Sequence, residues 1–305
     1  MFDAPYAQVL FDRQQLRRIR RTIGREVSDF AVDVESDPER TALVSTPFES
    51  IADTRDRLER LETLLLEQSD RRAVFLTVYT EMTRETVRGI ESGEFDRPGW
   101  MRRYLVRFAE YYRRAFYSYE RGALADVPDP WIVAFGTALD GDALVVQDAL
   151  LGINAHINYD LALALSDVGV DPDRPEKYAD HTRIDEILYR LVSVQQELLA
   201  RQYAPGLERL GERLGKLDDV VAGSSLETAR EYAWQVAALR SDVRWLPTER
   251  FTRWMLNRTA TGGAYLVLQP ESSPETMRAL RRIERGEFDL TSYARTFHDR
   301  ARAVS

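Results

Sequence analysis

The sequence of 305 residues predicts an all-α protein, a single-domain helical bundle built around a buried central helix over about 142–168. Three observations predict this fold. Apolar residues recur every three or four positions in nearly every segment, which is the period of an amphipathic helix. The connections between segments are short, which favours antiparallel helices packed side by side. The run at 142–168 is apolar on almost every side, as is typical of a helix inside a core.

The elements follow in order from their start and stop signals. Residues 1–45 are charged and weakly periodic, and we expect a first helix and a surface loop there, followed by the bundle domain over 46–305. Asp70 is a predicted helix N-cap, and Pro98 begins another helix. The predicted helices lie at about 50–68, 71–93, 98–122, 131–139, 142–168, 181–202, 206–216, 225–245, 247–260, 274–285 and 291–302.

Two segments do not fit the helical pattern. GVDPDRPEKYAD (169–180) carries two prolines and several polar residues, and it is the clearest predicted loop. AYLVLQP (264–270) is the one segment that could form a short strand.

The composition restricts the chemistry. The chain has no cysteine, which excludes disulfides, thiolate metal sites and cysteine nucleophiles. Any metal ion would have to be held by His, Asp, Glu or Asn side chains.

The charges are unusual in kind. Lysine occurs only at Lys177 and Lys216, so nearly all of the 42 basic residues are arginine, and 50 acidic residues give a net charge of −8. Few lysines, excess acid and absent cysteine together resemble halophilic proteins of salt-accumulating archaea, although a GC-rich genome would also favour arginine. Because phosphate contacts dominate nucleic-acid affinity, a net acidic chain argues against a nucleic-acid partner.

The start of the chain and its hydropathy predict a cytoplasmic protein. MFDAPYAQVLFDRQQLRRIRR lacks the basic-then-apolar order of a signal peptide. No uninterrupted apolar stretch reaches the roughly 20 residues that a transmembrane helix needs.

Four polar residues interrupt the central helix in LLGINAHINYDLALAL (150–165). His156 and Asp160 are one turn apart and share a face, whereas Asn154 and Asn158 form a second pair on nearly the opposite face. Each buried polar group without a hydrogen bond costs about 1–3 kcal/mol. All four side chains therefore need partners, and the segment is the predicted functional site.

Three roles are open for this site. His156 and Asp160 could ligate zinc or a similar divalent metal, since a histidine and a carboxylate one turn apart make a two-donor platform. They could instead act as a general acid and base without a metal. In the third role, all four polar side chains bond to neighbouring helices and fix their register.

Further metal ligands are predicted on other helices. Glu81 is one candidate, and Asp185, one turn beyond His181, is another. Helix length argues against Asp185. If 142–168 and 181–202 pair as a hairpin, His156 lies about 20 Å along the axis from the end of its helix, whereas Asp185 lies near the start of the returning helix. His298 is expected at the surface. The charged residues of REYAW (230–234) are also expected at the surface. His181 is either a metal ligand or an exposed residue.

The central segment resembles the signature of a family of uncharacterised proteins, a domain of unknown function (DUF5995). FDRPGWMRRYLVRFAEYY, PDPWIVAF and HTRIDEIL also resemble that family's pattern, over roughly 50–260. The resemblance implies a helical domain with NAHIN-x-D-L at its heart and implies no activity.

A more distant likeness concerns LG-x3-H-x3-DL, which is similar to a helix of zinc-dependent phospholipase C. This likeness implies that His156 and Asp160 hold a zinc ion in this chain. Those enzymes use several more histidines and an N-terminal tryptophan. This chain has three histidines and begins MFDAPY, so a trinuclear site cannot be built.

The leading hypothesis is a metal-dependent hydrolase of phosphoester or lipid-like substrates. His156 and Asp160 would hold the ion, Asn154 and Asn158 would orient helices or substrate, and Asp185 or Glu81 would complete the shell. The rival is a non-catalytic scaffold or ligand-binding protein whose NAHIN-x-D cluster is a structural network. A carrier of an apolar ligand is a third hypothesis and would need a large cavity.

Overall fold

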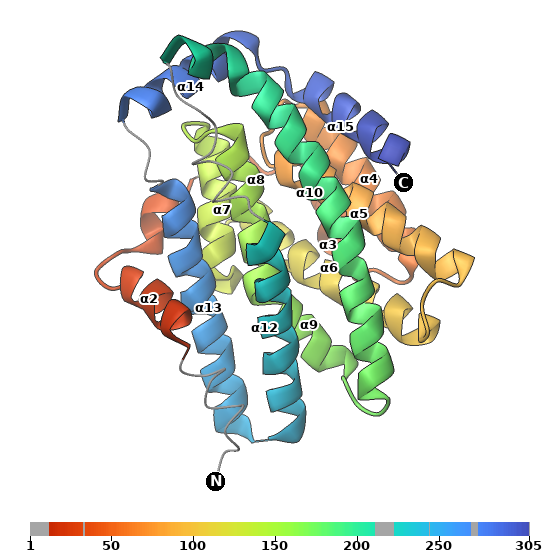
Figure 1. Ribbon diagram of the computed structural model, residues 1–305. Coiled ribbons are helices and arrows are strands. Elements are labelled where there is room, and N and C mark those ends of the chain that lie inside the picture. The colour runs from red at the N-terminus through yellow and green to blue at the C-terminus, as the bar shows by residue number, and fades with distance from the viewer. Residues whose placement is uncertain (1–11, 33, 211–222, 244, 270–273, 305) are drawn as a thin grey trace.

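The computed structural model describes residues 12–32, 34–210, 223–243, 245–269 and 274–304, and the regular elements in these ranges are all helical. It confirms the predicted all-α, single-domain bundle (Figure 1). The elements are α2 (Arg13–Arg21), η1 (Val27–Phe30), α3 (Pro38–Ser45), α4 (Ile51–Glu67), α5 (Ala73–Ser92), α6 (Pro98–Glu120), η2 (Leu124–Asp126), α7 (Asp129–Asp140), α8 (Val145–Ala155), η3 (His156–Asp160), α9 (Leu161–Val168), α10 (Arg174–Leu210), α12 (Gly223–Asp242), α13 (Leu246–Leu268), α14 (Pro274–Glu287) and α15 (Leu290–Val304).

The predicted central helix is α8, η3 and α9 taken together. α8 packs against α5, α7 and α13, and α9 packs against α6 and α12 (Figure 1). Its apolar residues are enclosed, since Leu151, Leu161 and Leu165 have no exposed surface. The neighbours of α9 are α12 and α6, rather than the helix at 181–202 that a simple hairpin would bring beside it.

Glycines allow the closest helix contacts. A Cβ at Gly152 would lie 2.4 Å from the ring of Phe75, so α5 can cross α8 there only because this position has no side chain. A Cβ at Gly262 of α13 would lie 2.0 Å from the carbonyl oxygen of Arg18 in α2. The backbone of α2 therefore packs directly against α13.

Residues 13–45, expected as a helix and a surface loop, form α2, η1 and α3. α2 packs against α13, η1 against α7, and α3 against α4 and α6. Val44 at the end of α3 is a buried member of the main core. The part of the predicted first segment at 1–11 lies outside the described residues.

Three local predictions need correction. The loop predicted at 169–180 is shorter, because α10 begins at Arg174 with Pro175 in its first turn, a position where proline's missing N–H costs nothing. The helices predicted at 181–202 and 206–216 are one helix as far as Leu210, and 211–216 lies outside the described residues. The strand considered at 264–270 is wrong, because α13 continues to Leu268.

Four buried charges tie α3, α5 and α6 together. Glu120 accepts a hydrogen bond from the Nη1 of Arg72 at 2.5 Å and another from the Nε of Arg40 at 3.1 Å, and its side chain has no exposed surface. Asp70 contacts the other side of Arg72 at 2.6 Å. Two arginines and two carboxylates thus neutralise one another inside the protein, which buried charges require.

Throughout the described ranges, none of the helices combines the length and the apolar character needed to cross a lipid bilayer.

Candidate functional site

The polar segment of the central helix is a π-helix. Residues His156–Asp160 have this geometry, and the N–H of Leu161 donates to the carbonyl oxygen of His156, five residues back. A π turn holds one more residue than an α turn and is frequent at functional sites. The turn lies between two α-helical stretches, so the site is built into an otherwise continuous helix.

His156 and Asp160 form a direct pair, as their spacing predicts. The Nδ1 of His156 lies 2.8 Å from the Oδ2 of Asp160, and the same oxygen accepts the indole N–H of Trp131 in α7 at 2.9 Å. His156 is 2% exposed and Asp160 is fully buried. The pair is therefore enclosed inside the bundle.

Aromatic rings enclose the imidazole of His156. Phe108 of α6 stacks on it with centroids 3.6 Å apart and planes 11° apart, and Tyr79 of α5 meets it edge-on at 4.5 Å. Aromatic rings are attracted in both of these geometries. The remaining rings around His156 are Phe75, Trp131 and Tyr112, with centroids at 5.8, 5.9 and 6.3 Å. We call these five rings the aromatic box.

Burial disfavours the charged form of both members of the pair. It lowers the pKa of His156 well below its ordinary value and raises the pKa of Asp160 well above its ordinary value, because the box provides little solvation for charge. The Nε2 of His156 and the Oδ1 of Asp160 are buried, and neither has a hydrogen-bond partner among the described residues.

Asn154 and Asn158 face the opposite side, as the helical spacing predicts. The amide of Asn154 donates to the carbonyl oxygen of Ala260 in α13 at 2.8 Å and accepts from Asn158 at 3.2 Å. Asn158 in turn accepts from Arg18 of α2 at 3.2 Å. The two asparagines thus connect the central helix to α13 and α2, and they do not contact the aromatic box through these bonds.

The two further predicted ligands have other partners. Glu81 contacts His298 at 2.6 Å and also pairs with Arg84, whereas Asp185 pairs with Arg230. Within the described part of the chain, no three His, Asp or Glu side chains are grouped so that they could hold a metal ion. His156 and Asp160 are thus brought together, and Glu81 and Asp185 do not join them.

His298 is not at the surface, which corrects the prediction. α15 packs against α5 and α4 and places the imidazole between two carboxylates. Its Nδ1 lies 2.6 Å from Glu81 and its Nε2 lies 2.8 Å from Glu62, and only 14% of the side chain is exposed. Burial alone lowers the pKa of His298, but the bonds to Glu62 and Glu81 outweigh burial and raise it to about 9.

This histidine should make stability depend on pH. The pKa of His298 is raised from 6.5 in the unfolded chain to about 9 in the fold, so its contribution is complete below pH 6.5 and is lost as pH rises through about 9. We expect a loss of about 3 kcal/mol across that window. Denaturant titrations at several pH values should show it in the wild type. The same fall in the His298→Gln variant would contradict the assignment.

His181 and Arg230 are also buried, so the exposed position predicted for Arg230 is wrong, and so is the exposed alternative for His181. His181 is 1% exposed, and its Nδ1 lies 3.0 Å from the hydroxyl of Tyr104. Arg230 is 1% exposed and donates to the carbonyl oxygen of His181 at 2.5 Å. Their burial arises because α12 packs against α10. Neither burial nor these partners can be read from a helical wheel.

Asp180 acts as a cap for another helix. It lies inside α10, yet its carboxylate accepts the backbone N–H groups of Asp96 at 2.8 Å and Arg97 at 2.7 Å, just before α6 begins. It stabilises the start of α6 from a neighbouring element.

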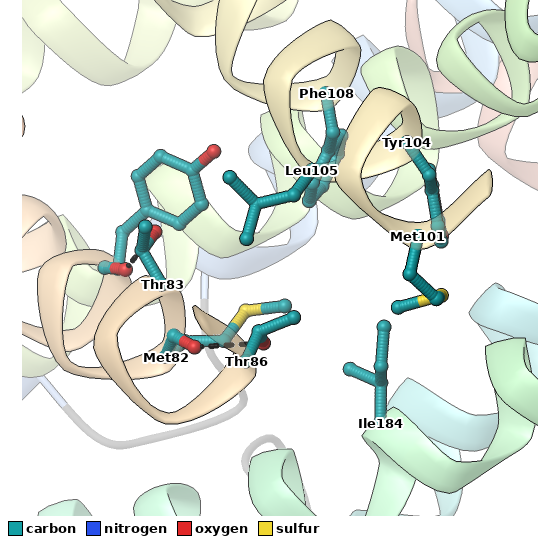
Figure 2. Close-up of a pocket in the computed structure, with 9 residues that line it drawn as sticks. Met82, Thr83, Thr86, Met101, Tyr104, Leu105, Phe108 and Ile184 are labelled. Atoms are coloured by element: carbon teal, nitrogen blue, oxygen red, sulfur yellow. Dashed lines mark hydrogen bonds between the residues drawn. The ribbon is translucent and has the colours of Figure 1, made fainter. Parts of the chain in front are cut away.

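A small apolar cavity lies beside the aromatic box. Figure 2 shows Met82, Thr83 and Thr86 of α5 facing Met101, Tyr104, Leu105 and Phe108 of α6, with Ile184 of α10 closing one side. The cavity measures about 20 Å³. That volume holds about one water molecule. Phe108, which stacks on His156, is part of its wall, and the cavity offers no room for a substrate next to the pair.

A much larger groove lies on the outer face of α6, between the α3–α4 connection and the end of α9. Its volume is about 960 Å³. Its basic side chains are Arg102, Arg103, Arg107 and Arg114, and its apolar side chains include Phe48, Ile51, Val106 and Val168. We call this surface the arginine groove. It is concave and combines apolar area with positive charge, as ligand sites do.

The carboxylates of the groove are largely neutralised by arginines. Glu110 accepts from Arg113 at 2.7 and 2.9 Å, and Asp167 accepts from Arg107, with the closest approach at 2.6 Å. Glu49 is the third acidic residue of the lining and is exposed. The groove therefore keeps positive charge on a chain whose net charge is −8.

Arg102 and Arg103 supply that charge. Both are exposed, and neither has an ion-pair partner in the described structure. Arg103 donates to the carbonyl oxygen of Gly99 at 3.1 Å. Two adjacent guanidinium groups without carboxylates are available to bind an anion.

The groove was not predicted from the sequence, although the sequence contains a signal for it. In WMRRYLVRFAEYYRR, Arg103, Arg107 and Arg114 recur at spacings of four and seven and so fall on one helix face. A basic stripe on one helix of an acidic protein indicates an anion-binding surface. The apolar partners Phe48 and Ile51 come from a distant segment and could not be assigned to it from spacing.

The comparisons with known proteins give one match. The model of the Family of unknown function (DUF5995) matches residues 51–270, from the start of α4 to just beyond α13. No curated protein and no solved structure matches the chain. The matched range covers the π-helical segment and most of the arginine groove. It confirms the family that the NAHIN-x-D-L segment resembles, and the chain belongs to the Family of unknown function (DUF5995).

Proposed function

We propose that this protein is a non-catalytic binding protein, which holds a small lipid-like anion in the arginine groove and uses the NAHINYD segment as a structural network. The observation that carries the proposal is the contrast between the two places. His156 and Asp160 are buried, and the aromatic box encloses the imidazole. The groove, by contrast, is open, has a volume of about 960 Å³ and is lined by four arginines.

The hydrolase hypothesis has less support. A metal site at His156 would need more donors, but its Nδ1 is engaged by Asp160, and Glu81 and Asp185 are engaged elsewhere. These residues do not fit a zinc ion, which takes at least three protein ligands in a catalytic site. A general acid–base pair would also need a substrate within hydrogen-bond reach, and the neighbouring cavity has the volume of about one water.

The chemistry of the groove defines the ligand class. Arg102 and Arg103 would bind a phosphate or carboxylate through charge-assisted hydrogen bonds. Val106, Ile51 and Phe48 would cover an alkyl chain, since each presents apolar surface to the groove. The predicted ligand is therefore an anion with an apolar tail, in agreement with the lipid-like partner expected from the sequence.

Calorimetric titration with dodecyl phosphate below its micellar concentration tests this function. The wild type should bind it, and should bind dodecanol or inorganic phosphate at least about tenfold more weakly, because each lacks one half of the ligand. Arg102→Gln/Arg103→Gln should lose at least about tenfold in affinity.

The matched control is Arg20→Gln/Arg21→Gln, which removes the same charge from an adjacent exposed pair on α2. It should bind like the wild type. Equal losses in both double variants would mean that the effect comes from net charge, and the groove would no longer be the proposed site.

A further inference from the structure

We propose that the end of the α12–α13 hairpin docks on the surface of an anionic lipid bilayer. Trp245, Leu246, Phe251 and Trp254, which we call the aromatic tip, would enter the interface between headgroups and acyl chains. The inference goes beyond the arginine groove and does not depend on it.

The aromatic tip is the main concentration of exposed apolar side chains. Over the described ranges, nine large apolar residues are exposed, and four of them lie within the ten residues from Trp245 to Trp254. Their exposed fractions are 61, 69, 42 and 48% for Trp245, Leu246, Phe251 and Trp254. Single exposed apolar residues are normal in a monomeric protein, but a cluster of this kind indicates an interaction surface.

The shape and residue types favour a bilayer as the occupant. The tip lies where α12 passes into α13, and Figure 1 shows this end of the two helices at the lower edge of the molecule. Phe251 and Trp254 have ring centroids 5.9 Å apart, so they form one small apolar surface. Tryptophan, phenylalanine and leucine beside arginine are typical of segments that lie in the membrane interface.

The charges around the tip complement anionic headgroups. Arg250 and Arg253 are exposed and lie between the apolar residues of the tip along α13, where they outnumber the exposed carboxylate of Glu249. Arg240, near the end of α12, is held against α13 by its bonds to the Thr252 hydroxyl at 3.1 Å and the Glu249 carbonyl at 3.5 Å. Basic residues near a bilayer surface are attracted to anionic lipids.

Vesicle sedimentation tests the proposal. The full chain is mixed with vesicles of phosphatidylglycerol and phosphatidylcholine, and in parallel with vesicles of phosphatidylcholine alone. We expect co-sedimentation with the first and much less with the second. Leu246→Ser/Phe251→Ser should lower the partition coefficient at least about tenfold, because the variant lacks two apolar side chains that the bilayer interface would bury.

Tryptophan fluorescence gives a second readout in the same variants. Of the five tryptophans, Trp100, Trp131 and Trp234 are buried, at 3, 0 and 6% exposure, whereas the other two belong to the tip. Bromine-labelled acyl chains should therefore quench the wild type through the tip alone. Leu246→Ser/Phe251→Ser retains both reporters and should lose the quenching.

The control is Ile23→Ser/Tyr189→Ser, which removes two apolar side chains that are 76 and 68% exposed elsewhere on the molecule. It should bind vesicles like the wild type, and so should Arg102→Gln/Arg103→Gln. The proposal is overturned if the wild type does not sediment with anionic vesicles, or if the tip variant binds as well as the control. It is also overturned if only the groove variant loses binding, or if the tip holds two copies together without vesicle binding.

Discussion

The His156→Ala variant should lose about 3–5 kcal/mol of its free energy of unfolding. The substitution removes a ring that stacks on Phe108 at 3.6 Å, and it leaves a cavity inside the aromatic box. It also deprives the buried carboxyl of Asp160 of the Nδ1 partner, leaving only the indole of Trp131. Cavity formation and loss of a buried hydrogen bond are both destabilising, and here they act at one position.

Denaturant unfolding of four proteins separates the two causes: wild type, His156→Ala, Asp160→Asn and the double variant. If the pair is a structural network, the double variant should be more stable than the sum of the single losses predicts, since both partners are then changed together. Metal content should be the same in all four. A His156→Ala variant that keeps wild-type stability and loses one equivalent of bound zinc would favour the hydrolase hypothesis instead.

Glu120→Ala should be similarly destabilising, by about 3–5 kcal/mol. Glu120 is fully buried and lies between Arg40 and Arg72, whose side chains are only 9 and 1% exposed. Without it, Asp70 alone faces two buried guanidinium groups. The loss therefore comes mainly from charge that remains without compensation in a medium of low polarity.

The control for this variant is Glu186→Ala, since Glu186 is an exposed glutamate within α10. It should change the free energy of unfolding by less than about 0.5 kcal/mol. Both variants can be measured by denaturant titration under the same conditions. A loss below about 1 kcal/mol in Glu120→Ala would show that water reaches these charges.

Local patterns in the sequence predicted much of the fold. The apolar period located α4, α5 and α6 within a few residues, and the all-apolar run located the central helix. Helical spacing also paired His156 with Asp160 and separated this pair from the asparagines. These features depend on residues within a turn or two of one another, so a one-dimensional pattern contains them.

The features that were missed depend on which helices pack together. Glu81 meets His298 across 217 residues, and Arg230 meets His181 across 49, and neither separation carries a local signal. The π turn at His156–Asp160 was also missed, because one extra residue in a helix leaves the apolar pattern almost unchanged. The arginine groove is lined by residues from separate segments of the chain, which come together only in the fold. Its apolar residues could therefore not be assigned to it from the sequence.

The hydrogen bonds of His298 to Glu62 and Glu81 determine when this part of the fold can form during synthesis of the chain. The histidine follows these two carboxylates by 236 and 217 residues. While the chain is being made, α4 and α5 emerge long before α15, and a domain generally folds as one unit. Glu62 and Glu81 therefore meet the imidazole of His298 only after α15 has been made, so this side of the bundle closes late in synthesis, although Glu81 has Arg84 beside it from the start.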